Sequence, residues 1–213
     1  MNEKTPRVYR SRLRDEQAAQ TRLRILEAAA TVFAARGYSA ATMPAIATEA
    51  GVSTESVKAA GTKAELLVAS FELAFTGTEG ADSLADTLTG TGVIDLPADT
   101  FLPTLVDRIA DANARGHGLW SVLVGAGLSD ALVADALSRI LGRRHQDFDR
   151  LVHELTARGA APTDPAAAAA ELSFTLSPEG YQQLVIQSGW TEDRYRAWII
   201  ERTTAIVGST ARR

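Results

Sequence analysis

The sequence contains no cysteine and only three histidines, and both shortages exclude kinds of chemistry. Without cysteine the chain can form no disulfide, no zinc–thiolate site and no thiol-based catalytic centre. The histidines, His117, His145 and His153, share no spacing that is typical of a metal site. We therefore expect the protein to use no metal and no other cofactor.

Long apolar runs are also missing. No uninterrupted apolar stretch approaches the roughly 18 residues that indicate a membrane span. The basic N-terminus is followed by Asp15, Glu16 and Gln17 rather than by the apolar segment of a signal peptide. These absences predict a cytoplasmic protein that has no membrane partner.

Aromatic residues make up only 6% of the chain, and its apolar residues are mostly Ala and Leu rather than the Val, Ile and Tyr that strands favour. This composition predicts an all-α fold. With 213 residues, the chain is long enough for a small domain joined to a larger one. The sequence shows no nucleophile–base pair, carboxylate pair or phosphate-binding loop, so we do not expect an enzyme.

Positive charge is concentrated in the first third of the chain, although the net charge of the whole is -4. Residues 1–63 hold ten Lys and Arg against six Asp and Glu, whereas residues 64–213 hold twelve against twenty. This asymmetry is compatible with an N-terminal nucleic-acid partner and equally with a solvated basic tail on an acidic protein.

Helix signals in this basic third follow a helix-turn-helix pattern. A mobile arm over residues 1–16 is expected to precede a helix from about Gln17 to Arg36. Thr42 is positioned to cap a second, short helix, Gly51 then allows a tight turn, and Ser53 is positioned to cap a third helix through about Ala59. A capping box, Thr62 with Glu65, opens a fourth helix.

The remaining residues predict a larger helical bundle. A loop is expected over residues 76–100, with one turn of helix at about residues 83–88, and helical patterns follow from Phe101 to Gly116 and over Leu119–Leu128. Later helices are expected at about residues 129–158, after Asp164 and Ser177, which each precede a proline, and after Thr191. We divide the chain into an N-terminal arm and three-helix domain, residues 1–66, and a C-terminal domain, residues 67–213.

Residues 20–70 combine several of these signals in an order that closely resembles the DNA-binding domain of the tetracycline-repressor (TetR) family. The matching elements are Gly37-Tyr38, Thr42, Ile46-Ala47, Ala50-Gly51-Val52-Ser53, and Lys63 followed by Leu66-Leu67. The run from Leu176 to Trp198 also looks like the tail of many members. The resemblance implies a homodimeric transcriptional regulator that binds a double-stranded DNA operator, in most cases a repressor released by a small-molecule effector.

The third helix leaves its polar residues on the side facing away from the second helix, where they are candidates for reading the DNA groove. Helix N-termini can hold phosphates, which adds the residues that open the second and fourth helices. Some of these side chains also cap helices, and capping alone would explain their type. The candidate DNA-binding residues are Thr42, Ser53, Thr54, Glu55, Ser56, Lys58 and Lys63.

The sequence departs from the family where the third helix ends. Family members usually carry a Tyr that helps to contact the phosphate backbone and a Phe that packs the small domain. Here the segment from Ser56 to Gly61 has no aromatic residue and is one residue shorter. The alternative is therefore a dimeric ligand-binding protein whose DNA-binding head has degenerated.

In the C-terminal domain, His117, Trp120, Phe148 and Phe174 are candidates for a ligand pocket, and core packing is the alternative role for each. Glycines flanking His117 would leave room beside a helix. Residues 166–176 and 194–207 have apolar faces wider than one neighbouring helix can cover. We expect these two helices to build the homodimer.

Overall fold

The computed structural model describes residues 6–80 and 92–208, with side chains from Arg14 onward. All regular elements of these residues are helices, which confirms the all-α fold. The N-terminal helices are α1 (Pro6–Ala40), α2 (Met43–Ala50), α3 (Thr54–Ala60) and α4 (Lys63–Thr76). The later elements are η1 (Val93–Asp95), α6 (Ala98–Gly127), α7 (Ala131–Ala157), α8 (Pro165–Thr175), α9 (Pro178–Tyr181), the π-helical η2 (Gln182–Gln187) and α10 (Glu192–Val207).

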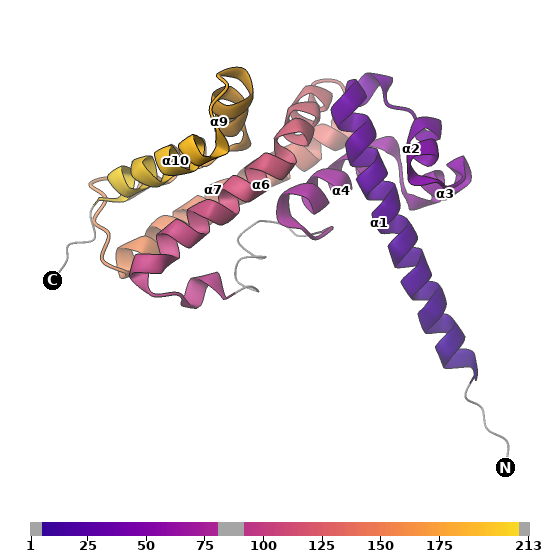
Figure 1. The fold of residues 1–213 in the computed structure, drawn as a ribbon, viewed down its shortest axis with the longest axis horizontal. Helices are drawn as coiled ribbons and strands as arrows, with labels where there is room; N and C mark the ends of the chain where they lie inside the picture. The colour runs from indigo at the N-terminus through magenta and orange to yellow at the C-terminus, as the bar shows by residue number, and fades with distance from the viewer. Residues whose placement is uncertain (1–5, 81–91, 209–213) are drawn as a thin grey trace, which may run out of the picture.

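The helices form a head and a body. Figure 1 shows α2 and α3 beside α1 at one end, whereas α6 and α7 run side by side through the body and α9 and α10 lie at the other end. Helix α4 packs on both α1 and α6 and so joins head and body. Within the described residues, no helix is both long enough and apolar enough to cross a membrane.

Helices α2, α3 and α4 begin where the sequence predicts them because their capping side chains accept backbone hydrogen bonds. Thr42 accepts from Ala45 N at 3.3 Å, and Ser53 accepts from Ser56 N at 3.1 Å. Thr62 and Glu65 make both bonds of the capping box. Side-chain caps also open the later helices that the sequence predicts, at Asp164, Ser177 and Thr191.

The expected arm over residues 1–16 is wrong for its described part, because α1 already begins at Pro6. Residues 1–5 lie outside the described residues. Between Arg7 and Arg36 the chain contains no glycine or proline and is rich in Arg, Leu, Glu, Gln and Ala, which favour helix. The helical dihedral angles are interrupted at Gly37 (φ 70°, ψ 175°), where the sequence predicts the helix end.

Helix α6 is continuous across Gly116, whereas the sequence suggested two helical segments, with room beside a helix at the glycines that flank His117. That room is filled by Phe75 of α4: a Cβ on Gly116 would lie 2.8 Å from Phe75 Cδ2. The glycine therefore allows α4 to approach α6 closely. The turn expected at residues 83–88 lies outside the described residues.

Two hydrophobic cores hold the fold together. The head core is built from α1 to α4 and includes Ile25, Phe33 and Leu67, and it also takes in Trp120 and Leu123 from the far part of α6. The second core joins the first part of α6 to α7, α8 and α10. Both cores thus share α6.

The fit of Phe75 against Gly116 predicts opposite effects for two glycine substitutions in α6. Gly116→Ala must displace Phe75, and overpacking of this kind costs about 1–3 kcal/mol, which outweighs the roughly 0.5–1 kcal/mol that any Gly→Ala change inside a helix gains. Gly125→Ala, the control, meets nothing within 4 Å and gains about 0.5–1 kcal/mol of helix stability. Urea unfolding of both variants measures the difference, and equal stabilisation would contradict the close packing of Phe75.

Candidate nucleic-acid interface and ligand cavity

Helices α2 and α3 form a helix-turn-helix unit held by one glycine and one buried valine. Gly51 adopts φ 64°, a left-handed conformation that only glycine adopts readily. Val52 N then donates to Ala47 O at 3.0 Å, which closes the turn. Val57 is fully buried and packs α3 onto the head. The opposite side of α3 therefore faces solvent.

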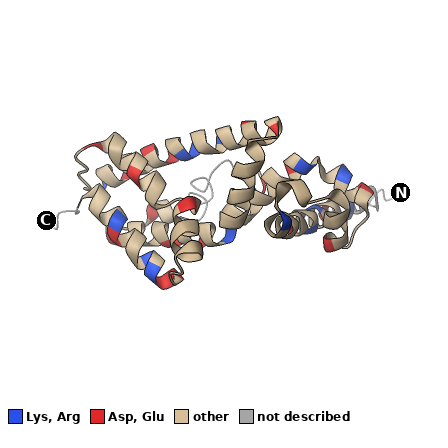
Figure 2. Cartoon of the chain, turned by 90° about the horizontal axis from the view of Figure 1, so that it is seen from above, with Lys and Arg blue, Asp and Glu red and all other residues tan. Residues whose placement is uncertain are grey.

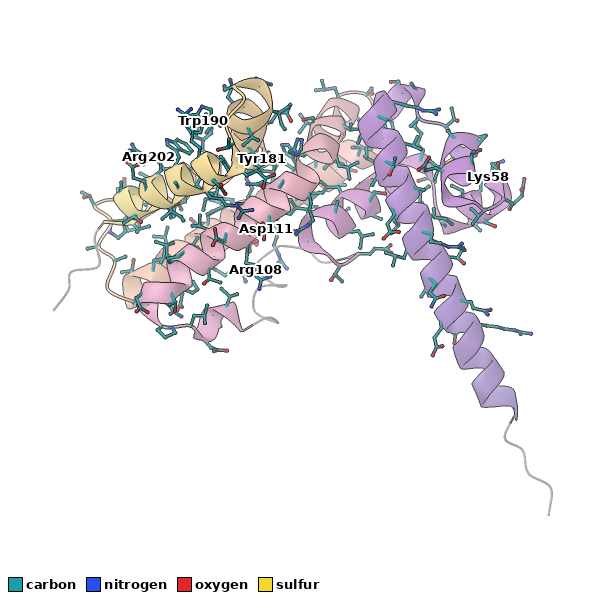
Figure 3. The ribbon with its side chains drawn as sticks, in the orientation of Figure 1. Lys58, Arg108, Asp111, Tyr181, Trp190 and Arg202 are labelled. Atoms are coloured by element: carbon teal, nitrogen blue, oxygen red, sulfur yellow. The ribbon has the colours of Figure 1, made fainter. Side chains whose placement is uncertain are left out.

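The candidate groove-reading residues lie along this outer side. Glu55 and Lys58 are exposed, Thr54 and Ser56 are half-buried, and Ser53 is exposed while also capping α3. Lys58 lies at the outer edge of the head in Figure 3, at the opposite end of the molecule from α10. In Figure 2 basic and acidic residues alternate along the ribbon of both head and body.

The two DNA-binding candidates at helix N-termini, Thr42 and Lys63, occupy different environments. Thr42 is exposed at the start of α2. Lys63, the first residue of α4, is half-buried: its Nζ donates to Ser39 O at 3.3 Å and lies 4.5 Å from the centroid of the Tyr38 ring. Lys63 therefore ties the start of α4 to the end of α1, and a phosphate would have to draw its ammonium from these contacts.

At the end of α3, where the family's aromatic residues are missing, an arginine holds the chain. Arg22 of α1 donates from Nη1 to Ala60 O at 2.6 Å and from Nε to both carboxylate oxygens of Glu79, at 2.9 and 2.8 Å. Glu79 lies just beyond α4, so one guanidinium connects three segments of the head. The hydrogen bonds of Arg22 supply part of the attachment that an aromatic side chain would give by burial.

A second polar contact connects the head to α7. The Tyr38 hydroxyl donates to Asp130 Oδ2 at 2.7 Å, while Asp130 Oδ1 accepts from the backbone of Leu132 and Val133 at the start of α7. The hydrogen bond from Tyr38 and that from Val133 hold the pKa of Asp130 below its ordinary value. Burial, together with the bond to Asp130, raises the pKa of Tyr38. One carboxylate thus caps α7 and holds the end of α1.

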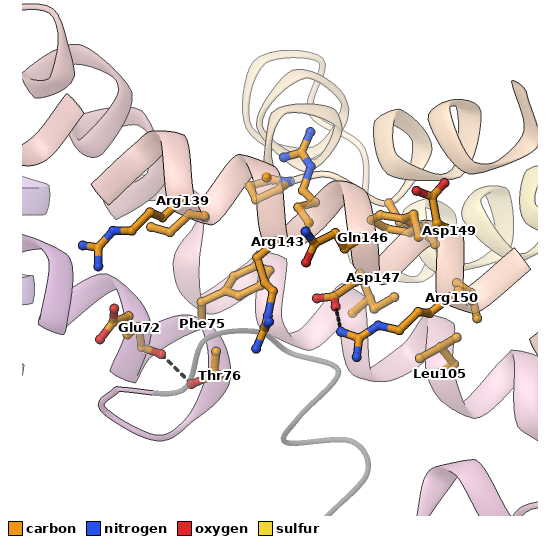
Figure 4. Close-up of a pocket in the computed structure, with 18 of the residues that line it drawn as sticks. Glu72, Phe75, Thr76, Leu105, Arg139, Arg143, Gln146, Asp147, Asp149 and Arg150 are labelled. Carbon is orange, nitrogen blue, oxygen red and sulfur yellow. Dashed lines mark hydrogen bonds and ion pairs between the residues drawn. The ribbon is translucent and has the colours of Figure 1, made fainter. Parts of the chain in front are cut away.

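The body contains a cavity of about 990 Å³ between α4, α6 and α7. This volume is at the upper end of the roughly 300–1,000 Å³ that small-molecule sites occupy. Figure 4 shows Phe75 of α4 and Leu105 of α6 among its lining residues, with arginines and acids of α7 along one side. The apolar part of the lining includes Val68, Phe71, Phe75, Phe101, Ile109 and Phe148.

Two of the four pocket candidates line this cavity, Trp120 and Phe148. His117 and Phe174 are not among its lining residues. The His117 ring packs on Tyr181, with the ring centroids 5.1 Å apart, and Phe174 is 71% exposed on the outer side of α8. Helical spacing alone could not distinguish these positions, because each lies in an apolar helix whose orientation depends on its neighbours.

Sequence reasoning did not identify the face of α4 that lines the cavity, nor the contacts of Arg22 and Tyr38. The apolar stripe of α4, with Phe71 near its centre, indicates burial but does not show that part of it borders an open space. Asp130 has a recognisable signal, since Asp is a preferred N-cap residue one position after the predicted helix start at Ser129.

Comparison with known proteins relates the head to a known family of regulatory proteins. Residues 25–70 match the family model described as bacterial regulatory proteins, tetR family. This segment runs from within α1 to within α4 and includes the whole helix-turn-helix unit. No curated protein matches the chain.

Solved structures share the fold of most of the chain. A protein described as a transcriptional regulator from Saccharomonospora viridis, in complex with choline, superposes with a TM-score of 0.66 at 21% identity, covering 86% of this chain and 95% of that one. A regulator from Pseudomonas aeruginosa PAO1 gives 0.67 at 20% identity, covering 90% and 92%. A TetR-family regulator from a Rhodococcus species gives 0.69 at 17% identity, covering 89% and 100%.

At these identities the structures show a shared fold and carry no assignment of ligand or operator. The family model supplies the sequence match that they lack, over the helices whose caps, turn and buried valine are described above. Over residues 25–70, the N-terminal part of the chain thus matches the tetR family of bacterial regulatory proteins.

Proposed function

We propose that this protein is a homodimeric transcriptional repressor of the bacterial cytoplasm, which binds an operator through α3 and releases it when a small molecule occupies the cavity in the body. The observation that carries the proposal is the position of α4, which packs in the head and also lines the cavity. In this proposal, residues 1–66 bind DNA and residues 67–213 sense the ligand. Helix α4 crosses the boundary between these two parts.

Opposite sides of α4 serve the two functions. Leu66 and Leu67 are fully buried in the head core, and Ser70 Oγ donates to Leu26 O at 3.0 Å. Phe75 and Val68 line the cavity. A ligand that contacts Phe75 and Val68 would favour one placement of α4, and the head would follow. Its effect on DNA affinity would equal its differential affinity for the two placements.

The Tyr38–Asp130 hydrogen bond would fix the head at a second point. Because Asp130 caps α7 and α7 lines the cavity, a shift of α7 would act on the end of α1 through this bond. Two points of attachment, α4 and Tyr38, define the orientation of the head better than one. Orientation matters because a dimer must place both recognition helices about one DNA turn apart.

The dimer would form on the outer faces of α8 and α10, which pack beside each other. On α8, Ala167 and Ala170 are exposed and allow a partner helix to approach closely, and Phe174 is 71% exposed on the same side. On α10, Ala197 and Ala205 are exposed. A second copy would cover Phe174 and these alanines.

The second candidate function is that of a dimeric ligand-binding protein whose DNA-binding head has degenerated. The missing aromatic residues after Val57 support it. In that case the cavity and dimer would remain, but α3 would bind DNA weakly or not at all. Choline in the S. viridis structure supports a small organic effector for this fold in either case. Direct measurement of DNA binding separates the two functions.

For DNA binding, we predict that Lys58→Ala lowers the affinity for a palindromic duplex selected from a random library and reduces the slope of log K against log salt by about one. The exposed ammonium of Lys58 would otherwise neutralise one phosphate. Fluorescence anisotropy at several salt concentrations measures both quantities. Arg108→Ala, at an exposed position of α6 in the body, is the control and should change neither. Selection of no duplex by the wild-type protein would favour the degenerate head.

For the attachment of the head, we predict that Tyr38→Phe weakens binding to the full palindrome while leaving binding to a half-site duplex unchanged. The variant keeps the ring beneath Lys63 but removes the bond to Asp130, so it loosens the orientation of the head without altering α3. Ser39→Ala is the neighbouring control, because only its backbone carbonyl is used. An equal loss on both duplexes would place Tyr38 at the DNA instead.

For the dimer, we predict that Phe174→Asp converts the protein to a monomer at micromolar concentration, because it would bury a charge at the centre of the proposed interface. Leu128→Asp is the matched control: Leu128 is 89% exposed but lies away from α8 and α10. Sedimentation velocity measures the mass of each. A wild-type monomer, or a dimeric Phe174→Asp variant, would contradict this interface.

A further inference from the structure

We propose that the effector is an apolar molecule that carries a carboxylate, and that the indole N–H of Trp120 receives this carboxylate. The inference rests on the proposed function, since it concerns the ligand of the same cavity. Three observations carry it: a buried donor in the wall, acids that already have partners, and arginines on the neighbouring helix.

The buried donor is Nε1 of Trp120. Trp120 lines the cavity and is only 4% exposed, yet its N–H has no acceptor among the residues that the structure describes. Buried N–H groups are nearly always paired in folded proteins. Nε1 itself has almost no accessible surface, so a small turn of the ring toward the cavity would let a ligand oxygen accept this hydrogen bond.

The acids that line the cavity are already engaged, which disfavours a cationic ligand. Asp147 pairs with Arg150, as the dashed line in Figure 4 shows. Asp149 lies 3.5 Å from His145 Nε2, and Glu154 is 2.6 Å from Arg158 Nε. Glu72 accepts from Gly80 N at 3.0 Å. A quaternary ammonium would have to compete with these partners for its counter-charge.

The arginines of the cavity favour a ligand of negative charge. The Arg144 guanidinium lies 5.7 Å from the centroid of the Trp120 ring, while also bonding Ser173 and Glu179. Arg139 lines the cavity and, within the described residues, makes neither a hydrogen bond nor an ion pair. Both arginines come from α7. Arg144 therefore places a positive charge beside Trp120, and Arg139 adds another positive charge to the lining of the cavity.

The rest of the ligand should be apolar. Phe71 and Phe75 stack with their centroids 5.4 Å apart, and Phe71 lies 5.5 Å from Trp120. These rings, with Phe101 and Phe148, leave an apolar lining in a cavity of about 990 Å³. An alkyl chain or a ring system would fill this space, with the carboxylate at the Trp120 end.

The test uses two probes with the same decyl chain and opposite charge, decanoate and decyltrimethylammonium, titrated into the full-length protein by calorimetry. Decanoate should bind at least about tenfold more tightly. Trp120→Phe keeps an aromatic ring but removes the N–H, and should weaken decanoate about tenfold, the loss of one hydrogen bond to a charged group, while leaving the cation unaffected. Trp190→Phe, outside the cavity lining, is the control and should change neither.

A second variant keeps the proposal testable should Trp120→Phe fail to fold. Arg139→Gln, at an exposed position, should weaken decanoate a few fold and make its binding less sensitive to salt. Any of three results would overturn the ligand class. These are tighter binding of the cation than of decanoate, binding of neither probe at millimolar concentration, and unchanged decanoate affinity in both variants. Decanoate that binds as expected but does not release the selected duplex would leave the ligand class standing and contradict ligand-induced release.

Discussion

The close packing of α4 between α1 and α6 is the constraint on which the other features of this protein depend. Phe75 occupies the space above Gly116, and Ser70 bonds the backbone of α1. A helix held in this way transmits strain to its neighbours, because protein interiors are close-packed. The same helix lines the cavity, so the energetics of the cavity and of the head are joined.

The head is held together by hydrogen bonds as much as by burial. Arg22 attaches the end of α3, Lys63 bonds the end of α1, and Tyr38 reaches Asp130 on the body. These contacts are partly exposed, and partly exposed polar contacts contribute modestly to stability. The core beneath them, with Phe33 and Ile46 fully buried, provides most of the cohesion of the head, and of these polar contacts the Tyr38 bond is the one that reaches the body.

The body differs from the head in how it uses aromatic residues. In the head, Phe33 and Tyr38 stack at 6.1 Å and close the core. Around the cavity, Phe71, Phe75 and Trp120 pack on each other on one side and border open space on the other. Apolar surface left facing a cavity of this size is available for a ligand, and its burial would supply binding free energy.

The sequence by itself determined the local features of this protein. The caps at Thr42, Ser53 and Thr62, and the turn at Gly51, follow from side-chain chemistry within a few residues, so they could be predicted, together with the helix-turn-helix unit and the all-α class. Helix ends without a strong signal, such as the start of α1, could not, because long helices of charged residues differ little in sequence from a basic arm.

Only the tertiary structure decided which side chains border the cavity and which bonds join head to body. Tyr38 and Asp130 are 92 positions apart in the chain, and no local pattern relates them. Trp120 and Phe174 both lie in apolar helices, yet one is buried in the cavity wall and the other is exposed. The physical reason is that these roles depend on how helices rotate and approach one another, which is set by packing over the whole domain.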